Sequence, residues 1–221
     1  MAALLSNGGQ FCGGTLVASK YVVTAAHCMF LDQDATQPVS ASDITVRLGE
    51  HDLASSTDTT ILKDVKVKSI MNHESYKPAT GSLNNDITVL ELEEEVDINT
   101  YTPACLAQTT DATTFDGKNA LVYGWGTTSS GGASSSVLLE VEVPVVTKAT
   151  CESAMGPMED GQICAGGTLD KDACQVIILT HLSVLSASDP GRLRRSSQLR
   201  EQWPACPHWR RQLRGRLRET G

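Results

Sequence analysis

The chain has 221 residues, of which 40% are hydrophobic, and a formal net charge of −8. This length suits one large all-β domain or two small barrels that share a core. No apolar run approaches the roughly 18 residues that a membrane helix needs, so we expect no membrane-spanning helix among these residues. Seven cysteines favour an oxidising compartment over the cytosol. The first residues lack the basic start and apolar core of a signal peptide, so we expect a secreted protein whose signal peptide is not present in this chain.

The charge is unevenly distributed along the chain. Residues 1–175 contain 9 Lys and Arg against 23 Asp and Glu, a net charge of −14. Residues 176–221 contain 9 Arg against 3 acidic residues, a net charge of +6. So abrupt a change is typical of a domain or tail boundary. We therefore expect one domain over residues 1–175 and a basic tail over residues 176–221.

Two motifs near the start of the chain stand out among short strands and turns. Residues 11–16 read Phe-Cys-Gly-Gly-Thr-Leu, and residues 21–28 read Tyr-Val-Val-Thr-Ala-Ala-His-Cys. The second run ends at two alanines and presents His27 beside Cys28. A histidine just past a buried strand is held by rigid backbone, and its ordinary pKa lets it accept and return a proton near neutrality. A lone histidine in such a position is more often a packed or surface residue, so a catalytic role for His27 depends on the motif around it.

Together, these two motifs resemble the trypsin and chymotrypsin family of serine proteases, over about residues 2–175. The resemblance implies an all-β fold of two antiparallel, six-stranded Greek-key barrels, with residues 1–105 in the first and 106–175 in an incomplete second. It implies a monomeric serine endopeptidase that binds protein or peptide substrates and protease inhibitors. It implies no cofactor, no metal, and no nucleic-acid or membrane partner. It also implies two disulfides, Cys12–Cys28 and Cys151–Cys164.

The segment that begins at Asp86 resembles the second catalytic element of this family. Residues 44–48 and 60–71 alternate apolar and polar side chains, which predicts strands with one buried face. A turn-rich loop follows, and an Asn-Asp pair then opens the predicted strand over residues 86–92. The resemblance makes Asp86 the carboxylate that orients His27 and stabilises the imidazolium formed during proton transfer, a role taken from the general Ser-His-Asp template. Taken alone, Asp86 fits a turn residue that caps a strand as well as it fits a catalytic carboxylate.

Other candidate sites have weaker support. Glu50 begins the loop that binds calcium in some trypsins, but the later acidic positions are Thr57 and Thr60, so we expect no structural calcium. The remaining histidines show no metal-ligand spacing, and we interpret them as ordinary surface or loop residues: His51, His73, His181 and His208. The segment to which relatives often tie the cysteine at position 105 is missing here, so we assign no disulfide to that residue.

The first strand of the second barrel is predicted at residue 120. Residues 120–126, Ala-Leu-Val-Tyr-Gly-Trp-Gly, match the strand that opens this barrel in the family. A Gly/Ser/Thr-rich loop follows, and residues 137–146 form the next predicted strand, in which Pro144 indicates a bulge or an edge position.

The resemblance stops just after the specificity region. Asp172 matches the acid at the bottom of the trypsin specificity pocket, which implies cleavage after Lys or Arg. The family continues with Gly-Asp-Ser-Gly-Gly-Pro, whereas this chain continues with Val-Ile-Ile-Leu-Thr-His from Val176. The nucleophilic serine and the oxyanion-hole glycine are therefore missing, and the nearby serines lack flanking glycines: Ser183, Ser186 and Ser188. We predict that the chain as written is catalytically inactive.

Three interpretations follow. The change after Gln175 indicates a frameshift or a retained intron in the gene model of a trypsin-like protease, with a disordered or non-native tail. The arginines and tryptophans of the tail also allow a nucleic-acid or membrane-surface role, which we consider the weaker interpretation. The alternative for the whole chain is a non-catalytic protease homologue that acts as a binding or adaptor protein.

Overall fold

The computed structural model describes residues 1–30, 37–55, 57, 59–80, 84–107, 109, 111–127, 132–159, 161–166 and 177–180. All of these residues belong to one compact unit, Met1–Leu185. Most of the regular structure in them is β-strand, with one short α-helix and four 3-10 turns. The all-β fold expected from the sequence is confirmed. Among the described residues, no helix combines the length and hydropathy needed to cross a membrane.

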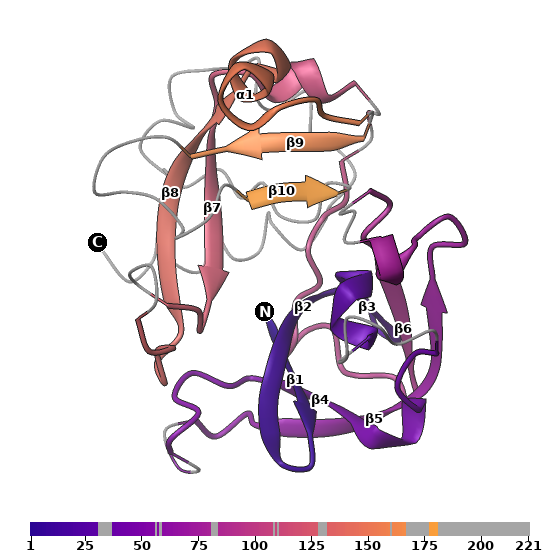
Figure 1. Cartoon of the computed structure of the whole chain (residues 1–221). Helices are drawn as coiled ribbons and strands as arrows, with labels where there is room; N and C mark the ends of the chain where they lie inside the picture. The colour runs from indigo at the N-terminus through magenta and orange to yellow at the C-terminus, as the bar shows by residue number, and fades with distance from the viewer. Residues whose placement is uncertain are drawn as a thin grey trace, which may run out of the picture. The chain divides into compact units, whose positions relative to one another are not determined.

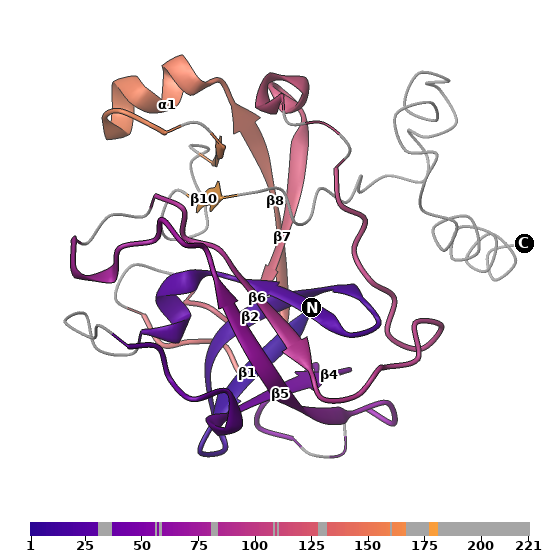
Figure 2. The ribbon, with the colours of Figure 1, turned by 90° about the vertical axis from the view of Figure 1, so that its right-hand side faces the viewer.

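The first part of the chain folds into a closed, antiparallel six-stranded barrel (Figure 1). Its strands follow the order β1-β2-β3-β6-β5-β4, and pairing of β4 with β1 closes the ring. Figure 2 shows the same strands after a quarter turn. The bounds of the strands are β1 Ala2–Ser6, β2 Gly9–Ala18, β3 Tyr21–Thr24, β4 Ile44–Leu48, β5 Lys63–Asn72 and β6 Thr88–Leu92.

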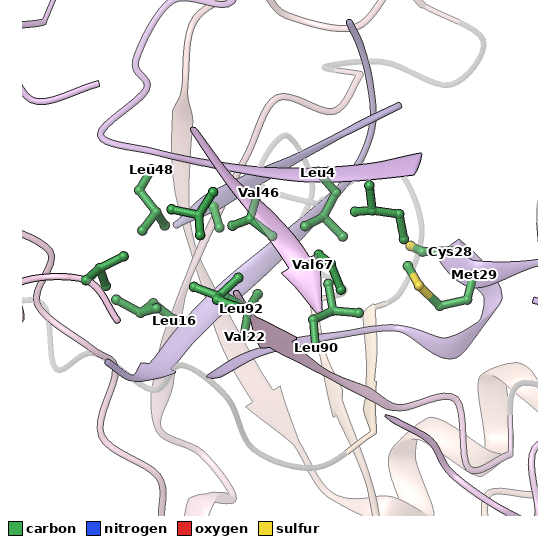
Figure 3. Packing of buried hydrophobic residues seen from close by; sticks show 14 residues of the cluster. Leu4, Leu16, Val22, Cys28, Met29, Val46, Leu48, Val67, Leu90 and Leu92 are labelled. Atoms are coloured by element: carbon green, nitrogen blue, oxygen red, sulfur yellow. The ribbon is translucent and has the colours of Figure 1, made fainter. Parts of the chain in front are cut away.

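Every second side chain along β4 and β6 is buried inside this barrel. In β4, Ile44, Val46 and Leu48 are buried while the residues between them are half-buried, as the sequence pattern predicted. Strand β6 repeats this arrangement, with Leu90 and Leu92 fully buried. Apolar side chains from all six strands meet in one cluster, part of which Figure 3 shows. Irregularities in the register of β1–β2, β2–β3 and β5–β6 bend the strands, which helps the sheet to close.

Two turns depend on backbone conformations with positive φ. Asn7 (φ 50°) and Gly8 (φ 80°) form the two-residue connection between β1 and β2. Positive φ at both central positions is the geometry that Asn-Gly favours in tight hairpins. Gly49 (φ 73°) ends β4, and a Cβ at this position would clash with the backbone carbonyl of Ile61.

The described residues of the second barrel form an open, four-stranded antiparallel sheet with the order β10-β9-β8-β7. Its elements are β7 Asn119–Gly124, β8 Leu139–Val146, helix α1 Lys148–Met155, β9 Gln162–Ala165 and β10 Ile177–Thr180. Pro144 pairs with Asn119 of β7, while pairing of β8 with β9 begins only at Val145. Pro144 therefore lies where β8 has a strand on one side only, which suits a residue without an amide hydrogen.

Strand β10 was not predicted from the sequence. It pairs antiparallel with β9, from Ile177 opposite Ala165 to Thr180 opposite Gln162. Its sequence, Ile-Ile-Leu-Thr, is rich in residues that favour strands, and the edge of β9 offers unpaired backbone groups. A short part of the segment assigned to the tail thus forms a strand, and the rest of the tail lies outside the described residues.

Contacts around Trp125 join the second sheet to the first barrel. Trp125 is buried with Ala3 and Leu5 of β1, and its indole Nε1 donates a hydrogen bond to the carbonyl of His51 over 3.0 Å. The amide of Leu138 donates to the same carbonyl over 2.7 Å. His51, interpreted from the sequence as an ordinary loop residue, therefore contributes its backbone to this junction.

The residue before His51 holds a buried carboxylate. The side chain of Glu50 is only 1% exposed. Its Oε1 accepts a hydrogen bond from the His51 amide over 3.0 Å, and its Oε2 lies 3.4 Å from the guanidinium of Arg47. A buried charge requires such partners. Arg47 and the His51 amide thus satisfy the carboxylate that opens the calcium loop in some trypsins.

Disulfides connect neighbouring elements in both parts. The predicted pairs Cys12–Cys28 and Cys151–Cys164 are both present. Cys105 is also disulfide-bonded, which corrects the expectation that it forms none. The expectation failed because it considered only the partner that this cysteine usually has in relatives.

Candidate active site

His27 lies in a short 3-10 turn that directly follows β3. This turn, Ala26–Met29, buries Ala26, Cys28 and Met29, so His27 is its one exposed residue. Thr24 is the last residue of β3. Its hydroxyl donates a hydrogen bond to the Gly13 carbonyl over 2.7 Å, which ties the end of β3 to β2. The small alanines allow the chain to turn tightly against the core, and the imidazole points away from it with its side chain 56% exposed.

Asp86 reaches the same place from the start of β6, which pairs with β3. The preceding Asn85 has a φ of 57°, a conformation that asparagine tolerates better than most residues. The amide of Ile87 donates to the Asn85 carbonyl over 2.8 Å and closes the turn. Asp86 is buried, with 7% of its surface exposed. Two neighbouring strands of one closed barrel therefore set the positions of both side chains.

The Asp86 carboxylate binds His27 through both of its oxygens. Oδ2 lies 2.7 Å from the imidazole Nδ1, and Oδ1 accepts a hydrogen bond from the His27 backbone amide, also over 2.7 Å. Because an ionised carboxylate only accepts hydrogen bonds, Nδ1 must carry the proton. In the neutral imidazole, Nε2 is then the proton acceptor. The carboxylate thus fixes both the tautomer and the orientation of the ring.

The surroundings also shift the pKa of the histidine. The hydrogen bond from His27 to Asp86 raises the pKa of the imidazole above its ordinary value, burial lowers it, and the charge of Asp86 raises it further. The net effect is a raised pKa. The pair therefore stabilises the imidazolium, the state that a general base reaches after it accepts a proton.

Two aromatic residues near this pair were not predicted from the sequence. The rings of Phe30 and Tyr76 lie 5.7 Å apart. Burial, and then the negative charge of Asp86, raise the pKa of the Tyr76 hydroxyl. Tyr76 lies in the turn-rich loop between the predicted strands over residues 60–71 and 86–92. An aromatic residue shortly before the Asn-Asp pair was the available signal.

The Cys12–Cys28 disulfide fixes the position of the histidine turn. It ties the turn to β2 across a sequence separation of 16 residues. Closing a loop of this size reduces the entropy of the unfolded chain and stabilises the fold by about 3 kcal/mol. Cys12, His27 and Cys28 are also the only group among the described residues that could hold a metal ion. In the disulfide form, however, neither sulfur is the thiolate that binds a metal.

The model of the trypsin family matches residues 1–175, which covers the barrel, the paired histidine and aspartate, and the second sheet up to β9. The chain belongs to the trypsin family of serine proteases. It is 36% identical to trypsin-3 of Salmo salar over 178 residues, covering 78% of this chain and 67% of that protein. It is 33% identical to the CLIP domain-containing serine protease HP8 of Bombyx mori over 180 residues, covering 76% of this chain and 48% of that protein.

A solved structure supports the same fold. The mouse serine protease neuropsin superimposes with a TM-score of 0.66 and 27% identity, over 82% of this chain and 78% of that chain. Other curated trypsin relatives are longer: the chain spans 10% of the serine protease filzig of Drosophila melanogaster. The chain spans less than half of the length of most curated relatives that it matches.

Of the predicted catalytic and specificity residues, the structure describes only His27 and Asp86. The structure brings His27 and Asp86 together, with the Cys12–Cys28 disulfide beside them. Asp172, the predicted specificity acid, lies outside the described residues, as do Ser183, Ser186 and Ser188. The segment where the family carries its nucleophile reads Val-Ile-Ile-Leu-Thr-His from Val176.

Proposed function

We propose that this chain carries the general-base half of a trypsin-like endopeptidase site and, with the sequence it has after Gln175, does not cleave peptide bonds. The observation that supports the first part is the 2.7 Å contact between His27 Nδ1 and the buried carboxylate of Asp86. Sequence alone supports the second part, because Gly-Asp-Ser-Gly-Gly-Pro is replaced.

In a chain with the family nucleophile, His27 would act as general base and Asp86 as the residue that positions it. Nε2 would take the proton of the attacking serine hydroxyl and later give it to the leaving amine, as in the general Ser-His-Asp template. Asp86 would hold Nδ1–H and stabilise the imidazolium throughout. The exposure of the His27 side chain leaves Nε2 accessible to a substrate.

The substrate class rests on Asp172. A carboxylate at the bottom of the specificity pocket would pair with Lys or Arg, so the intact form would cleave proteins or peptides after basic residues and bind inhibitors with a basic residue at that position. Without the nucleophile, turnover falls by a factor on the order of 10⁶ in such sites. The remaining rate acceleration depends on substrate binding and on the oxyanion hole, whose glycine is also replaced here.

We assign the protease domain to residues 1–175, with 1–105 in the first barrel, and treat 176–221 as a sequence foreign to the family. The disulfides support a secreted protein. Transcript sequencing across the Gln175 codon tests the boundary. A frame that encodes Gly-Asp-Ser-Gly-Gly-Pro would identify a frameshift or retained intron, whereas a clean transcript that encodes Val176 onward would contradict that explanation.

A second candidate is a non-catalytic homologue that acts as a binding or adaptor protein. The closed first barrel favours it, because a complete barrel offers a stable binding surface without any catalysis. A monomeric, cooperatively unfolding chain that binds a protein partner without hydrolysing it would support this candidate.

The activity test uses the purified 221-residue chain with Arg-amide substrates and a fluorophosphonate that labels activated serines. We expect neither hydrolysis nor labelling. His27→Ala is the control variant, because it removes the general base and leaves Asp86 in place. Hydrolysis by the chain that disappears in His27→Ala would overturn the proposed inactivity.

A further inference from the structure

The two nitrogens of the His27 imidazole have different surroundings. Nδ1 lies 2.7 Å from Asp86 Oδ2 and carries the proton, so Nε2 keeps its lone pair. The side chain is 56% exposed, which leaves the ring accessible from solvent. We propose that His27 Nε2 is a nucleophile toward activated aryl esters, and that the chain hydrolyses this class of substrate without a serine. The activity rests on the same tautomer of His27 as the proposed function, but it needs neither the missing serine nor a specificity pocket.

The backbone around His27 holds the ring in one orientation. The Asp86 carboxylate binds both the backbone amide and the ring Nδ1 of His27, each over 2.7 Å. The two residues after His27, Cys28 and Met29, are buried at the end of the barrel core (Figure 3). A disulfide joins Cys28 to Cys12 of β2. The imidazole therefore loses little side-chain freedom when it attacks a substrate.

The sulfur beside Nε2 does not compete for its lone pair. Cys28 Sγ lies 3.7 Å from His27 Nε2. Because this sulfur is bonded to the sulfur of Cys12, it carries no hydrogen and cannot donate a hydrogen bond to the ring. The lone pair of Nε2 is therefore available to an electrophile that approaches from the exposed side of the ring.

Asp86 makes Nε2 a stronger nucleophile. Its hydrogen bond to the ring raises the pKa of His27 above the ordinary value, burial lowers that pKa, and the charge of Asp86 raises it further. A more basic atom is generally the stronger nucleophile. Attack on an ester also places positive charge on the ring. The buried carboxylate of Asp86 lies 2.7 Å from Nδ1 and stabilises that charge.

Two steps complete one turnover. In the first, the Nε2 lone pair forms a bond to the acyl carbon, the bond from that carbon to the aryl oxygen breaks, and the aryloxide leaves with its electron pair. In the second, water attacks the acyl carbon and the bond to Nε2 breaks. The acid leaves as a carboxylate, and both protons of the water pass to solvent. Nδ1 keeps its proton and its hydrogen bond to Asp86 in both steps.

The leaving group limits this activity to activated esters. Imidazole itself leaves an acyl carbon readily, so the reaction proceeds only when the substrate has a leaving group at least as good, such as a nitrophenolate. The nitrogen of a peptide bond leaves only after it is protonated, and an oxyanion hole assists that step in the family. The motif that supplies both the serine and an oxyanion-hole donor is replaced after Gln175. Peptide bonds therefore stay intact while aryl esters are hydrolysed.

The experiment follows the release of nitrophenolate from para-nitrophenyl acetate by the purified full chain. We expect hydrolysis in proportion to the chain concentration, and loss of most of this rate in His27→Ala. His51→Ala is the matched control, because it removes an exposed imidazole in the loop after β4, and it should keep the rate. Circular dichroism checks that each variant retains its strands.

Asp86→Asn tests the role of the carboxylate as a positioning residue. The amide of asparagine can donate a hydrogen bond to Nδ1, which favours the tautomer with the proton on Nε2 and removes the attacking lone pair. We expect the ester rate of this variant to fall toward that of His27→Ala, although the imidazole is still present. A structural role of Asp86 alone would leave the rate unchanged in a folded variant.

The ester rate should also follow the titration of His27. Nε2 attacks when the ring is neutral, so the rate should rise with pH and reach half of its maximum at the pKa of His27, which NMR measures on the same chain. This midpoint should lie above about 6.5, the ordinary value, because the hydrogen bond to Asp86 raises the pKa. The Tyr76 hydroxyl, on which the charge of Asp86 also acts, has a raised pKa and stays neutral over this range.

Three results would overturn this activity. The first is an ester rate that His27→Ala and His51→Ala change equally, and the second is a pH midpoint that differs from the measured pKa of His27. The third is an acyl group on a serine or a lysine instead of His27, located by mass spectrometry of the chain quenched with acid during turnover. The proposed function fails by a different result, because cleavage of Arg-amides would contradict the inactivity toward peptides and leave the ester result unaffected.

Discussion

The first barrel and the second sheet consist of similar antiparallel strands, but only the first closes on itself among the described residues. Every strand of the first barrel has a partner on both sides, because β4 pairs with β1. The second sheet has the order β10-β9-β8-β7 and stays open, so β10 and β7 are its two edge strands among the described residues. His27 and Asp86 come from strands that pair within the closed barrel. The closed barrel therefore accounts for the fixed geometry of the proposed general-base pair, which does not depend on the sequence after Gln175.

Removal of a side chain from the core of the closed barrel should have the largest effect. Leu90 is fully buried in β6, the strand that follows Asp86 and pairs with β3, which leads to His27. We expect Leu90→Ala to lower the free energy of unfolding by about 2–5 kcal/mol, because the packed barrel cannot collapse around the cavity. Urea denaturation measures this change. The matched control is Leu106→Ala, whose side chain is largely exposed and whose loss should change stability by less than about 0.5 kcal/mol.

A pair of identical substitutions compares the two regions directly. Val46 in β4 and Val143 in β8 are both buried, at 0% and 1% exposure. Each Val→Ala change removes two carbons, worth about 0.8 kcal/mol each in transfer free energy. We expect Val46→Ala to cost more, by about 1 kcal/mol, because an open sheet can relax around a cavity more easily than a closed barrel. Equal losses in urea denaturation would mean that both cores are equally rigid.

The junction between the two regions can be weakened by one substitution. Trp125→Phe keeps an aromatic ring among Ala3 and Leu5 but removes the hydrogen bond from Nε1 to the His51 carbonyl. We expect a loss of about 1 kcal/mol, the usual net value of such a bond. Thermal unfolding of the variant checks the value, and separate transitions of the two regions would show that this bond couples them. An unchanged melting temperature would contradict the assigned role.

Much of the first barrel could be predicted because its signals are local. The alternation in residues 44–48 and the two disulfides followed from the sequence and the family motifs. The hairpin at Asn7-Gly8 was missed although its turn signal is present in the sequence. Helix α1 was also missed, although Thr147 caps it by accepting a hydrogen bond from the Thr150 amide. Eight residues are too few for a helical period to stand out.

Other features depend on parts of the chain that are far apart in sequence. The junction joins Trp125 to the His51 carbonyl, and no local pattern marks a backbone carbonyl as the partner of a distant indole. Strand β10 forms because β9 has an unpaired edge, which is a property of the sheet rather than of residues 177–180. The contact between His27 and Asp86 is equally distant, and it was predicted only because the two family motifs carry that information.

The smallest predicted effect concerns the pH dependence of the His27–Asp86 pair in the closed barrel. The pKa of His27 is raised in the folded state, chiefly by its hydrogen bond to Asp86. The pair therefore stabilises the fold fully below the unfolded-state pKa of about 6.5 and loses this contribution as pH rises through the raised pKa. Because the imidazole is 56% exposed, solvent screening should limit the effect to less than about 1 kcal/mol.

Asp86→Asn tests this linkage, because the amide keeps the size of the carboxylate and removes its charge. The stability difference between the original chain and Asp86→Asn should be larger near pH 5.5 than near pH 8.5, and the pKa of the His27 imidazole, followed by NMR, should fall in the variant. His51→Ala serves as the control, since the His51 side chain is exposed and belongs to the loop after β4, not to β3 or β6. A difference that grows as pH rises would mean that Asp86 favours the neutral imidazole, and the general-base assignment of His27 would then lose its electrostatic support.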